Sequence, residues 1–309
     1  MGVTHMKFDD VAQMIGRTPH VRVRSPEARG AEIYIKLESY NPTGSIKDRA
    51  GIYLIRGMLE EGRLRPGMRL LEASSGNMAC AIAFYGRLLG HPAELAVNSK
   101  LTADKRNFLL YYGARLHQVG DFTIDGNRFC RQMAEREPER YCFLDQLHNW
   151  QNPRAAYETL GPEILEAFPD VEMVVGSLGS GGSMLGTAQF LKERKGGVRA
   201  VTVQAAAGTK LPGTGGFDDG DYVTPFIAKG NSEGIFDHTV RITEADAVRR
   251  ALQLRDQGVF CGLQAGGVLH AALEAVREFD VRGTVVIVAG DSGWKNMEKL
   301  LQVSHAAND

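Results

Sequence analysis

The sequence predicts an α/β protein whose helices cover both faces of mostly parallel sheets. Short apolar runs alternate with helix-compatible segments along almost all of the 309 residues, which is the pattern of a parallel sheet built from repeated strand–helix units. Several of these runs end in Gly- and Ser-rich turns that open a helix. The chain is long enough for one large domain or for two moderate domains, each with its own core.

The first half of the chain is expected to alternate strands with helices. A short helix at residues 8–16 closes at glycine, and Thr18-Pro19 then turns the chain into the first strand. The expected strands are residues 20–23, 31–38, 68–73, 93–97, 114–119 and 141–144. The further helices expected here are residues 48–62, 78–89, 103–112 and 126–135.

The same alternation continues after Pro153. The expected strands are residues 173–175, 198–203, 259–261 and 284–289, and the expected helices are residues 154–168, 183–194, 244–256 and 267–279, with a last helix after Gly293. Residues 243–246 form a capping-box-like helix start. The long Gly- and Asp-rich passage at residues 205–220 is predicted to be a functional or mobile loop, because long unstructured loops in compact enzymes usually are.

Composition and charge exclude several classes of partner. Hydrophobic residues make up 43% and charged residues 24% of the chain, and the net charge is −1 with no long basic run. These values are typical of a soluble globular protein and argue against nucleic-acid and anionic-membrane partners. No apolar stretch approaches the roughly 18 residues of a spanning helix, and no signal-peptide core is present. The four cysteines form no CxxC pair and the histidines no HExxH motif, so we expect a cytoplasmic protein with reduced cysteines and no metal site.

The stretch from residue 41 to residue 49 reads Asn-Pro-Thr-Gly-Ser-Ile-Lys-Asp-Arg and joins a strand to a helix. Lys47 therefore falls near the first turn of a helix, where exposed amide groups and the positive helix end disfavour an ammonium. A lysine that loses its proton easily can act as a nucleophile or form a Schiff base. The alternative is a solvated surface lysine, which is common.

A Gly-rich turn between a strand and a helix is a candidate phosphate site, and it consists of Gly179, Ser180, Gly181, Gly182 and Ser183. Small residues allow backbone N–H groups and hydroxyls to surround a phosphate, and the helix N-terminus adds a favourable field. The turn lacks the Gly-Lys-Ser/Thr of a Walker A loop and the spacing of a dinucleotide site. A tight turn without a ligand is the competing interpretation.

Two more turns carry candidate ligand groups. Ser74, Ser75, Gly76 and Asn77 precede a second helix, where amides and hydroxyls suit a carboxylate and Asn77 can donate to a phenolic oxygen. Ser292 follows a fully apolar strand, so its hydroxyl is expected at the carboxyl end of that strand, where ligands bind in open α/β sheets. An ordinary helix cap and an ordinary turn residue are the alternatives.

Taken together, these groups match the requirements of one cofactor. The chain supplies a Schiff-base lysine, a phosphate cradle, a carboxylate site and a hydroxyl for a ring nitrogen. Pyridoxal 5'-phosphate needs this set of groups.

The chain resembles the cysteine synthase (O-acetylserine sulfhydrylase) family of pyridoxal-phosphate enzymes of fold type II. The resemblance runs nearly from end to end, and its motifs are residues 15–19 (Ile-Gly-Arg-Thr-Pro), 36–38 (Lys-Leu-Glu), 41–49, 72–77, 161–164 (Gly-Pro-Glu-Ile), 179–183 and 290–293. It implies two three-layer α/β domains with the active site in the cleft between them. Residues 38–145 would form a small mobile N-terminal domain, and residues 1–37 and 146–309 a large C-terminal domain.

The resemblance also assigns roles to residues. It implies that Lys47 carries the cofactor, that Asn77 contacts its 3-hydroxyl, that residues 179–183 hold its phosphate and that Ser292 meets the ring nitrogen. The substrate would contact Ser74, Ser75, Gly76, Met78, Gln146 and Gly215.

The implied reaction is a β-replacement in a homodimeric enzyme. Lys47 would remove the Cα proton, the β-substituent would leave to give an aminoacrylate, and a nucleophile would add to Cβ. An unprotonated ring nitrogen opposite Ser292 would favour elimination over transamination. The product is then L-cysteine, made from O-acetyl- or O-phospho-L-serine and a sulfur donor.

Residues 41–47, 268–273 and 293–295 resemble one branch most, which uses O-phosphoserine and a thiocarboxylated sulfur-carrier protein. The chain departs from the family pattern at three places that bear on which substrate it accepts. Met78 stands where the family has threonine, Gln264-Ala265 replaces Ser-Ser or Ser-Thr, and Gly215-Gly216 replaces an arginine that binds phosphate. Lys210 is a possible substitute for that arginine. These departures also suit a paralogue that makes another β-substituted alanine, such as a diaminopropionate derivative, and a non-catalytic binding partner with the same fold is a further alternative.

Overall fold

The computed structural model describes residues 7–99 and 101–306. The strands are β1 (His20–Val23), β2 (Glu32–Leu37), β3 (Arg69–Ala73), β4 (Ala93–Val97), β5 (Arg115–Gln118), β6 (Tyr141–Phe143), β7 (Met173–Ser177), β8 (Arg199–Ala205), β9 (His238–Ile242) and β10 (Thr284–Ala289). The α-helices are α1 (Lys47–Glu60), α2 (Asn77–Leu88), α3 (Ala103–Tyr111), α4 (Thr123–Arg136), α5 (Gln151–Ala155), α6 (Gly161–Ala167), α7 (Gly182–Arg194), α8 (Pro225–Ser232), α9 (Glu244–Arg255), α10 (Leu263–Glu278) and α11 (Met297–Ala306).

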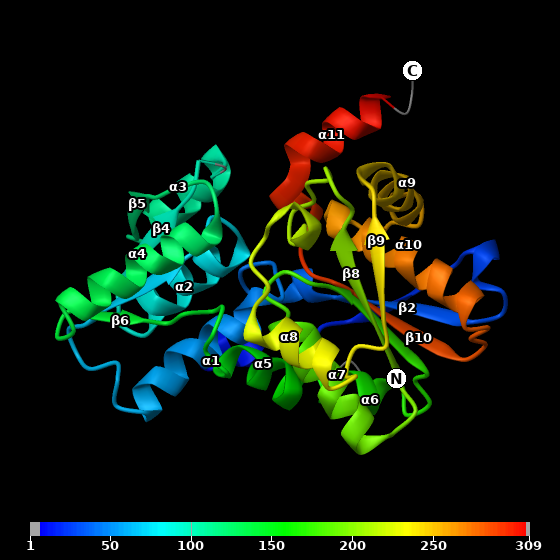
Figure 1. The fold of residues 1–309 in the computed structure, drawn as a ribbon, viewed down its shortest axis with the longest axis horizontal. Coiled ribbons are helices and arrows are strands. Elements are labelled where there is room, and N and C mark those ends of the chain that lie inside the picture. Colours follow the sequence, from blue (N-terminus) through cyan, green and yellow to red (C-terminus); the bar gives the residue numbers. More distant parts are fainter. Residues whose placement is uncertain (1–6, 100, 307–309) are drawn as a thin grey trace.

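These strands form two separate sheets, which lie in different halves of Figure 1. A six-stranded sheet has the order β1-β2-β10-β7-β8-β9, and a four-stranded sheet has the order β5-β4-β3-β6. Every described neighbour pair is parallel except β1–β2, which is antiparallel. The prediction of mostly parallel sheets is confirmed.

Helices cover both faces of the larger sheet because successive side chains of a strand point to opposite faces. Val285 and Ile287 of β10 pack with α9 and α10, whereas Val286 and Val288 of the same strand pack with α7 and α8. In the smaller sheet, Leu70 of β3 packs with α1 and α2, and the next residue of the strand packs with α4. The apolar strands predicted from sequence are therefore buried on both sides.

The chain passes from one sheet to the other along α1. Strand β2 pairs with β10 of the larger sheet, and α1 then leads to β3 of the smaller sheet. Helix α1 contacts both α2 and α5, and Figure 1 shows it below and between the two halves. No helix in the described ranges is long and apolar enough to cross a membrane.

Several predicted elements differ from the structure. The strand predicted at residues 259–261 is wrong, because Val259 closes the end of α9 through a bond to Leu254 and Cys261 makes only an isolated bridge to Ser292. The sequence interpretation missed α8, and it missed β9, an edge strand that mixes polar with apolar residues.

Several helices differ from the prediction in their limits or type, and α4 begins three residues before its predicted start. Helix α10 begins at Leu263, four residues before the predicted start. The predicted helix at residues 154–168 begins earlier, with α5, and contains a π-helical stretch, η4 (Ala156–Leu160), before α6. The first predicted helix is a 3-10 turn, η1 (Val11–Met14).

Candidate active site

Lys47 is the first residue of α1, as the turn chemistry of the sequence indicates. The preceding turn is closed by a bond from Gly44 N–H to Asn41 O at 2.8 Å, with Gly44 at φ 81°, a conformation that favours glycine. The Asp48 carboxylate accepts from Thr43 N–H at 3.0 Å and from Thr43 Oγ1 at 2.7 Å. This buried carboxylate therefore fixes the turn from the helix side.

The environment of Lys47 favours its neutral form. The side chain is partly buried, and burial lowers the pKa of its amino group to about 8, with the Glu72 carboxyl acting in the opposite direction. A larger share of free amine is then present near neutral pH than for a solvated lysine. Lys47 is thus prepared to act as a nucleophile or a base.

Glu72, near the end of β3, is the titratable partner of Lys47. It is fully buried, and burial raises the pKa of its carboxyl to about 8 although the backbone amides of Ala73 and Gln146 stabilise the charged form. Gln146 N–H donates to Glu72 Oε2 at 3.2 Å, and the Gln146 side-chain amide donates to Ala73 O at 2.9 Å. These contacts bring the predicted substrate ligand Gln146 to the end of β3.

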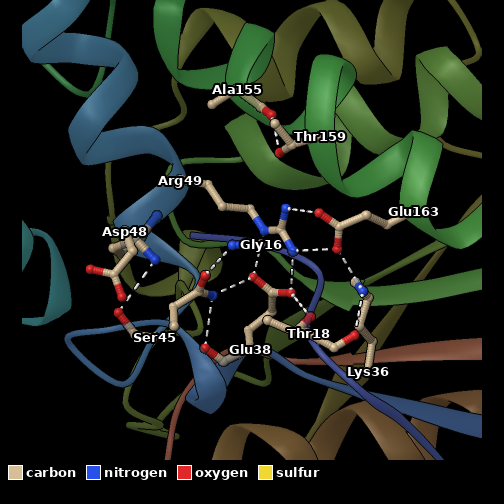
Figure 2. A network of polar contacts seen from close by, with 12 residues as sticks. Gly16, Thr18, Lys36, Glu38, Ser45, Asp48, Arg49, Ala155, Thr159 and Glu163 are labelled. Carbon is tan, nitrogen blue, oxygen red and sulfur yellow. Dashed lines mark hydrogen bonds and ion pairs between the residues drawn. The ribbon is translucent and has the colours of Figure 1, made fainter. Parts of the chain in front are cut away.

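A buried ionic network lies on the side of α1 that carries Arg49 (Figure 2). The Arg49 guanidinium donates to Glu38 at 2.7 and 2.9 Å and to Glu163 at 2.6 and 2.8 Å. Lys36 contacts Glu163 at 2.9 Å and Thr18 O at 3.0 Å. The network ties the start of α1 to β2, to α6 and to the N-terminal segment.

The Gly-rich turn at residues 179–183 opens α7. Gly181 has φ 82° and lies against Ile227, so a Cβ at this position has no room, and a Cβ at Gly182 meets the Asn152 side chain. Gly179 approaches Gly213 O, and Ser183 lies partly buried in the first turn of α7. Bare backbone at a helix N-terminus is the geometry that a phosphate group needs.

Asn152 joins the Gly-rich turn to Gln146. Its side chain is 1% exposed, and its Nδ2 donates to Gln146 O at 2.8 Å and to Ser180 Oγ at 3.0 Å. Thr224 Oγ1 donates to Ser180 O at 2.6 Å from the other side. Hydrogen bonds of Gln146 and Asn152 thus connect Glu72 to the Gly-rich turn, and the Glu72 carboxyl in turn influences the pKa of Lys47.

The Ser74–Gly76 turn opens α2 as predicted. Ser74 Oγ accepts from Gly76 N–H at 3.1 Å, and Ser75 Oγ accepts from Asn98 N–H at 2.7 Å. The two hydroxyls hold the turn in place, and the amides at the N-terminus of α2 suit an anion. Their contact with a substrate carboxylate stays a prediction.

Asn77 and Met78 follow in the first turn of α2. Asn77 Nδ2 donates to Asp291 Oδ2 at 2.9 Å, and Asn77 Oδ1 is buried with no partner in the described residues. Met78 is 1% exposed and belongs to the hydrophobic core of the smaller sheet. Asn77 therefore offers a free acceptor beside Asp291, whereas the predicted substrate contact of Met78 is untested.

Ser292 lies beside the turn that carries Lys47. Ile46 N–H donates to Gly290 O at 2.9 Å, and Ser292 N–H donates to Gly44 O at 3.4 Å. The Ser292 hydroxyl caps a 3-10 turn by accepting from Trp294 N–H at 3.3 Å. Residues 44–46 and 290–292 are thus adjacent, as the predicted site requires.

Gly215 lies in the loop that covers the Gly-rich turn. Its N–H donates to Leu178 O at 2.6 Å, and a Cβ at Gly215 would meet the Phe217 ring at 2.6 Å. The neighbouring Gly216 N–H donates to the Asp221 carboxylate at 2.9 Å. The loop therefore presents an aromatic ring and a carboxylate at this point, and Lys210 is exposed.

Sequence reasoning gave no role to several residues that build the site. Glu72, Asn152 and Asp291 are buried polar residues. Gln264, known only as a departure from the family pattern, donates to Ser177 Oγ at 2.6 Å and accepts from Gly290 N–H at 2.9 Å. Their polar character inside apolar or turn segments is the only local signal, and it does not reveal their partners.

Comparison with known proteins gives consistent matches. The family model of pyridoxal-phosphate dependent enzymes matches residues 11–291. Cysteine synthase B of Pseudomonas aeruginosa is 32% identical over 286 residues, 92% of this chain and 94% of that protein. O-acetylserine dependent cystathionine beta-synthase of Bacillus subtilis is 33% identical over 298 residues, 94% of this chain and 96% of that protein. The crystal structure of O-ureido-L-serine synthase matches with a TM-score of 0.84 at 25% identity and covers 94% of each chain.

Proposed function

This chain belongs to the family of pyridoxal-phosphate dependent enzymes, and on this basis we propose that it makes L-cysteine from an activated L-serine and a sulfur donor. It has the type II fold of these enzymes, uses pyridoxal 5'-phosphate and catalyses β-replacement. The proposal concerns the donor, the nucleophile and the roles of individual residues.

The observation that carries the proposal is the position of Lys47. Lys47 is the first residue of α1, burial lowers the pKa of its amine to about 8, and the Glu72 carboxyl acts on that pKa in the opposite direction. Asn77 Oδ1 is a buried acceptor without a partner, and the Gly-rich turn is a cradle that a Cβ at Gly181 would fill. These residues fit the cofactor, because it needs an amine, polar partners on its ring and a phosphate site.

Each residue then has a defined task. Lys47 and Asn77 would hold the cofactor, the N-terminus of α7 would hold its phosphate and Ser292 would lie at its ring nitrogen. The bound cofactor withdraws electrons from the Cα–H bond of the amino-acid substrate. Lys47, as free amine, removes the proton from Cα and later returns one to the same atom.

The substrate carboxylate is assigned to the N-terminus of α2. The first backbone amides of a helix have no partner within it, and a favourable charge at a helix N-terminus contributes roughly 0.3–1 kcal/mol. Gln146 lies at the end of β3 and is assigned to the other side of the substrate carboxylate. This arrangement orients Cα toward Lys47 without a guanidinium.

The donor we favour has an uncharged leaving group. A phosphoryl group in a partly buried site needs a bidentate cation, whereas Gly215 is covered by the Phe217 ring and Gly216 binds Asp221. The relative from Bacillus subtilis is described as O-acetylserine dependent. O-acetyl-L-serine is therefore the first donor to test, with O-phospho-L-serine second.

A second candidate function keeps the chemistry and changes the nucleophile. The similarity to O-ureido-L-serine synthase supports it, because that structure shares the fold over 94% of this chain. The product would be another β-substituted alanine, such as a diaminopropionate derivative. Buried Met78 and the Gln264 contacts separate this chain from the family pattern near the substrate.

The same proposal includes the assembly and the moving parts. We assign residues 38–145 to a small mobile domain and residues 1–37 and 146–309 to a large domain, in a cytoplasmic homodimer. The cysteines described as free, Cys80, Cys130, Cys142 and Cys261, are all buried, which fits a reducing compartment. A thiocarboxylated carrier protein is one candidate for the sulfur donor.

The test follows the absorbance of the purified enzyme through both halves of the reaction. Borohydride should attach the cofactor covalently to Lys47, and a Lys47→Ala variant should lose this attachment. O-acetyl- and O-phospho-L-serine are then added separately, before sulfide, a thiocarboxylated carrier or amines. If neither ester changes the absorption of the bound cofactor, the proposed function is wrong.

A further inference from the structure

We propose that Asp145, His148 and Tyr222 form an acid–base chain that takes the proton of the incoming nucleophile. The inference rests on the proposed function and deepens it by naming the nucleophile class. That class is a neutral amine or thiol, which must lose a proton when it attacks. An anion such as hydrosulfide or azide does not need the chain.

The three side chains are connected by hydrogen bonds. His148 Nδ1 lies 2.8 Å from Asp145 Oδ1, and His148 Nε2 lies 2.9 Å from Tyr222 Oη. Asn127 Nδ2 and Arg131 each donate to the Asp145 carboxylate at 2.8 Å. Asp145 is thereby held as the fixed end of the chain.

The carboxylate at one end defines the tautomer of the imidazole. Because Asp145 accepts from Nδ1, the neutral ring carries its proton there and leaves Nε2 as an acceptor. Tyr222 Oη then donates to Nε2, and the lone pairs of its oxygen face outward. A tyrosine in this state can receive a proton while it passes its own to the histidine.

The chain lies between the two segments that the proposed function assigns to ligands. His148 is two residues after Gln146, which bonds to the end of β3. Tyr222 is two residues before Thr224, whose hydroxyl bonds to Ser180 O in the Gly-rich turn. The contact between His148 and Tyr222 therefore joins the substrate side to the cofactor side.

The exposure of the His148 and Tyr222 rings is consistent with a position where the nucleophile enters the site from solvent. The His148 side chain is 30% exposed and Tyr222 is 40% exposed, whereas Asp145 is 14% exposed. A nucleophile that arrives from solvent meets the phenol first, and His148 can later release its proton to water. A purely structural link between two loops would not need this orientation from a partly buried carboxylate to an exposed hydroxyl.

The proton-transfer step balances without another reactant. The nucleophile forms its bond to Cβ with a lone pair, and its N–H or S–H bond breaks as the proton moves to Tyr222 Oη. The proton of Tyr222 moves to His148 Nε2, and the resulting imidazolium faces the Asp145 carboxylate. The π bond between Cα and Cβ, left when the β-substituent departs, breaks as the nucleophile adds, and its electron pair moves to Cα, which takes its proton from Lys47.

The experiment separates the two halves of the reaction in the holoenzyme. The wild type, Tyr222→Phe and His148→Gln are first mixed with the activated serine that the wild type accepts, and the absorption of the bound cofactor is followed. The neutral thiol 2-mercaptoethanol or the anion azide is added next. We expect an unchanged first half, an unchanged rate with azide, and a rate with 2-mercaptoethanol about 10²-fold lower in both variants, the scale of general acid–base catalysis.

Tyr53→Phe is the matched control, because Tyr53 Oη donates to Glu158 at 3.0 Å on another surface. It should leave all rates unchanged. Equal slowing with azide and 2-mercaptoethanol would show a structural link and overturn the proposal. Unchanged rates with 2-mercaptoethanol would overturn it too. A wild type that accepts activated serine but reacts only with anions would overturn it and leave the proposed function intact. A wild type that accepts no activated serine would overturn both.

Discussion

At the scale of single residues, Lys47 and Glu72 show how burial prepares a site. Burial lowers the pKa of Lys47 to about 8 and raises the pKa of Glu72 to about 8. Near neutral pH, Glu72 therefore keeps its proton for most of the time, and Lys47 has no permanently charged carboxylate beside it. A full ion pair would stabilise the ammonium and oppose its use as a nucleophile.

Glu72→Gln should stabilise the cofactor-free protein increasingly as the pH rises. Between pH 4.5 and about 8, the folded wild type binds more protons at Glu72 than the unfolded chain does, so its stability falls with pH. Glutamine keeps the shape and removes this titration. Urea unfolding of both proteins at several pH values measures the difference in free energy.

That difference should grow from pH 4.5 and level off above about 8. Titrating groups that Glu72 does not influence cancel because both proteins share them. A difference that is flat across this range would contradict the raised pKa of Glu72.

At the scale of elements, the ionic network of Arg49 fixes the position of the first turn of α1 relative to β2 and α6. Burial alone would raise the pKa of Glu163, but Arg49 and Lys36 lower it to about 2, so the carboxylate is charged. A buried ion pair stabilises a fold little in comparison with apolar packing. Each charge still needs its partner, because an unpaired buried charge is costly, so the pair fixes which groups lie together. Here they hold the helix that starts with Lys47 against α6.

Glu163→Gln should destabilise the protein by about 3–5 kcal/mol, the cost of leaving a buried charge without its partner. In the variant, Lys36 loses its ion pair with residue 163, and Arg49 keeps only its ion pair with Glu38. Denaturant unfolding measures the loss. The control is Glu193→Gln, whose surface carboxylate bonds to Tyr157 and Gln189 and should cost less than about 1 kcal/mol. Equal losses would show that the network has no special weight.

At the scale of the whole molecule, two sheets meet along α1 and along a few polar contacts. Arg49 with Glu163 and His148 with Tyr222 join segments far apart in the sequence. The first contact is buried, and the second is partly exposed. Buried contacts open rarely, whereas exposed ones exchange readily with water. This difference favours a hinge at α1 and movement at the far side of the site.

Addition of the activated serine should therefore make the molecule more compact. A substrate whose carboxylate binds the Ser74–Gly76 turn, and whose amine reaches the cofactor site on the larger sheet, draws residues 38–145 toward that sheet. Small-angle X-ray scattering should show a smaller radius of gyration. Hydrogen exchange should slow in the loop at residues 206–224 and stay slow around Arg49 in both states. Identical scattering with and without substrate would refute the closure.

Most strands and helices could be predicted from the sequence because their apolar runs and turn residues are local signals. The limits of β1, β4 and β10 agree with the prediction, and α1 begins one residue before its predicted start. The strand predicted at residues 259–261 failed because a short apolar run can equally cap a helix and enter the core. Edge strand β9 was missed because partial exposure removes the continuous apolar pattern.

Local chemistry thus determined the turn before Lys47, the cradle at residues 179–183 and the family, since these depend on residues adjacent in the chain. Only the tertiary structure decided that Glu72 influences the pKa of Lys47, that Asn152 bonds to both Gln146 and Ser180, and that His148 bonds to Tyr222. These contacts join residues from different strands and loops, and no local pattern contains their partners. The pKa of Lys47 follows from the same cause, because burial is a property of the packed molecule.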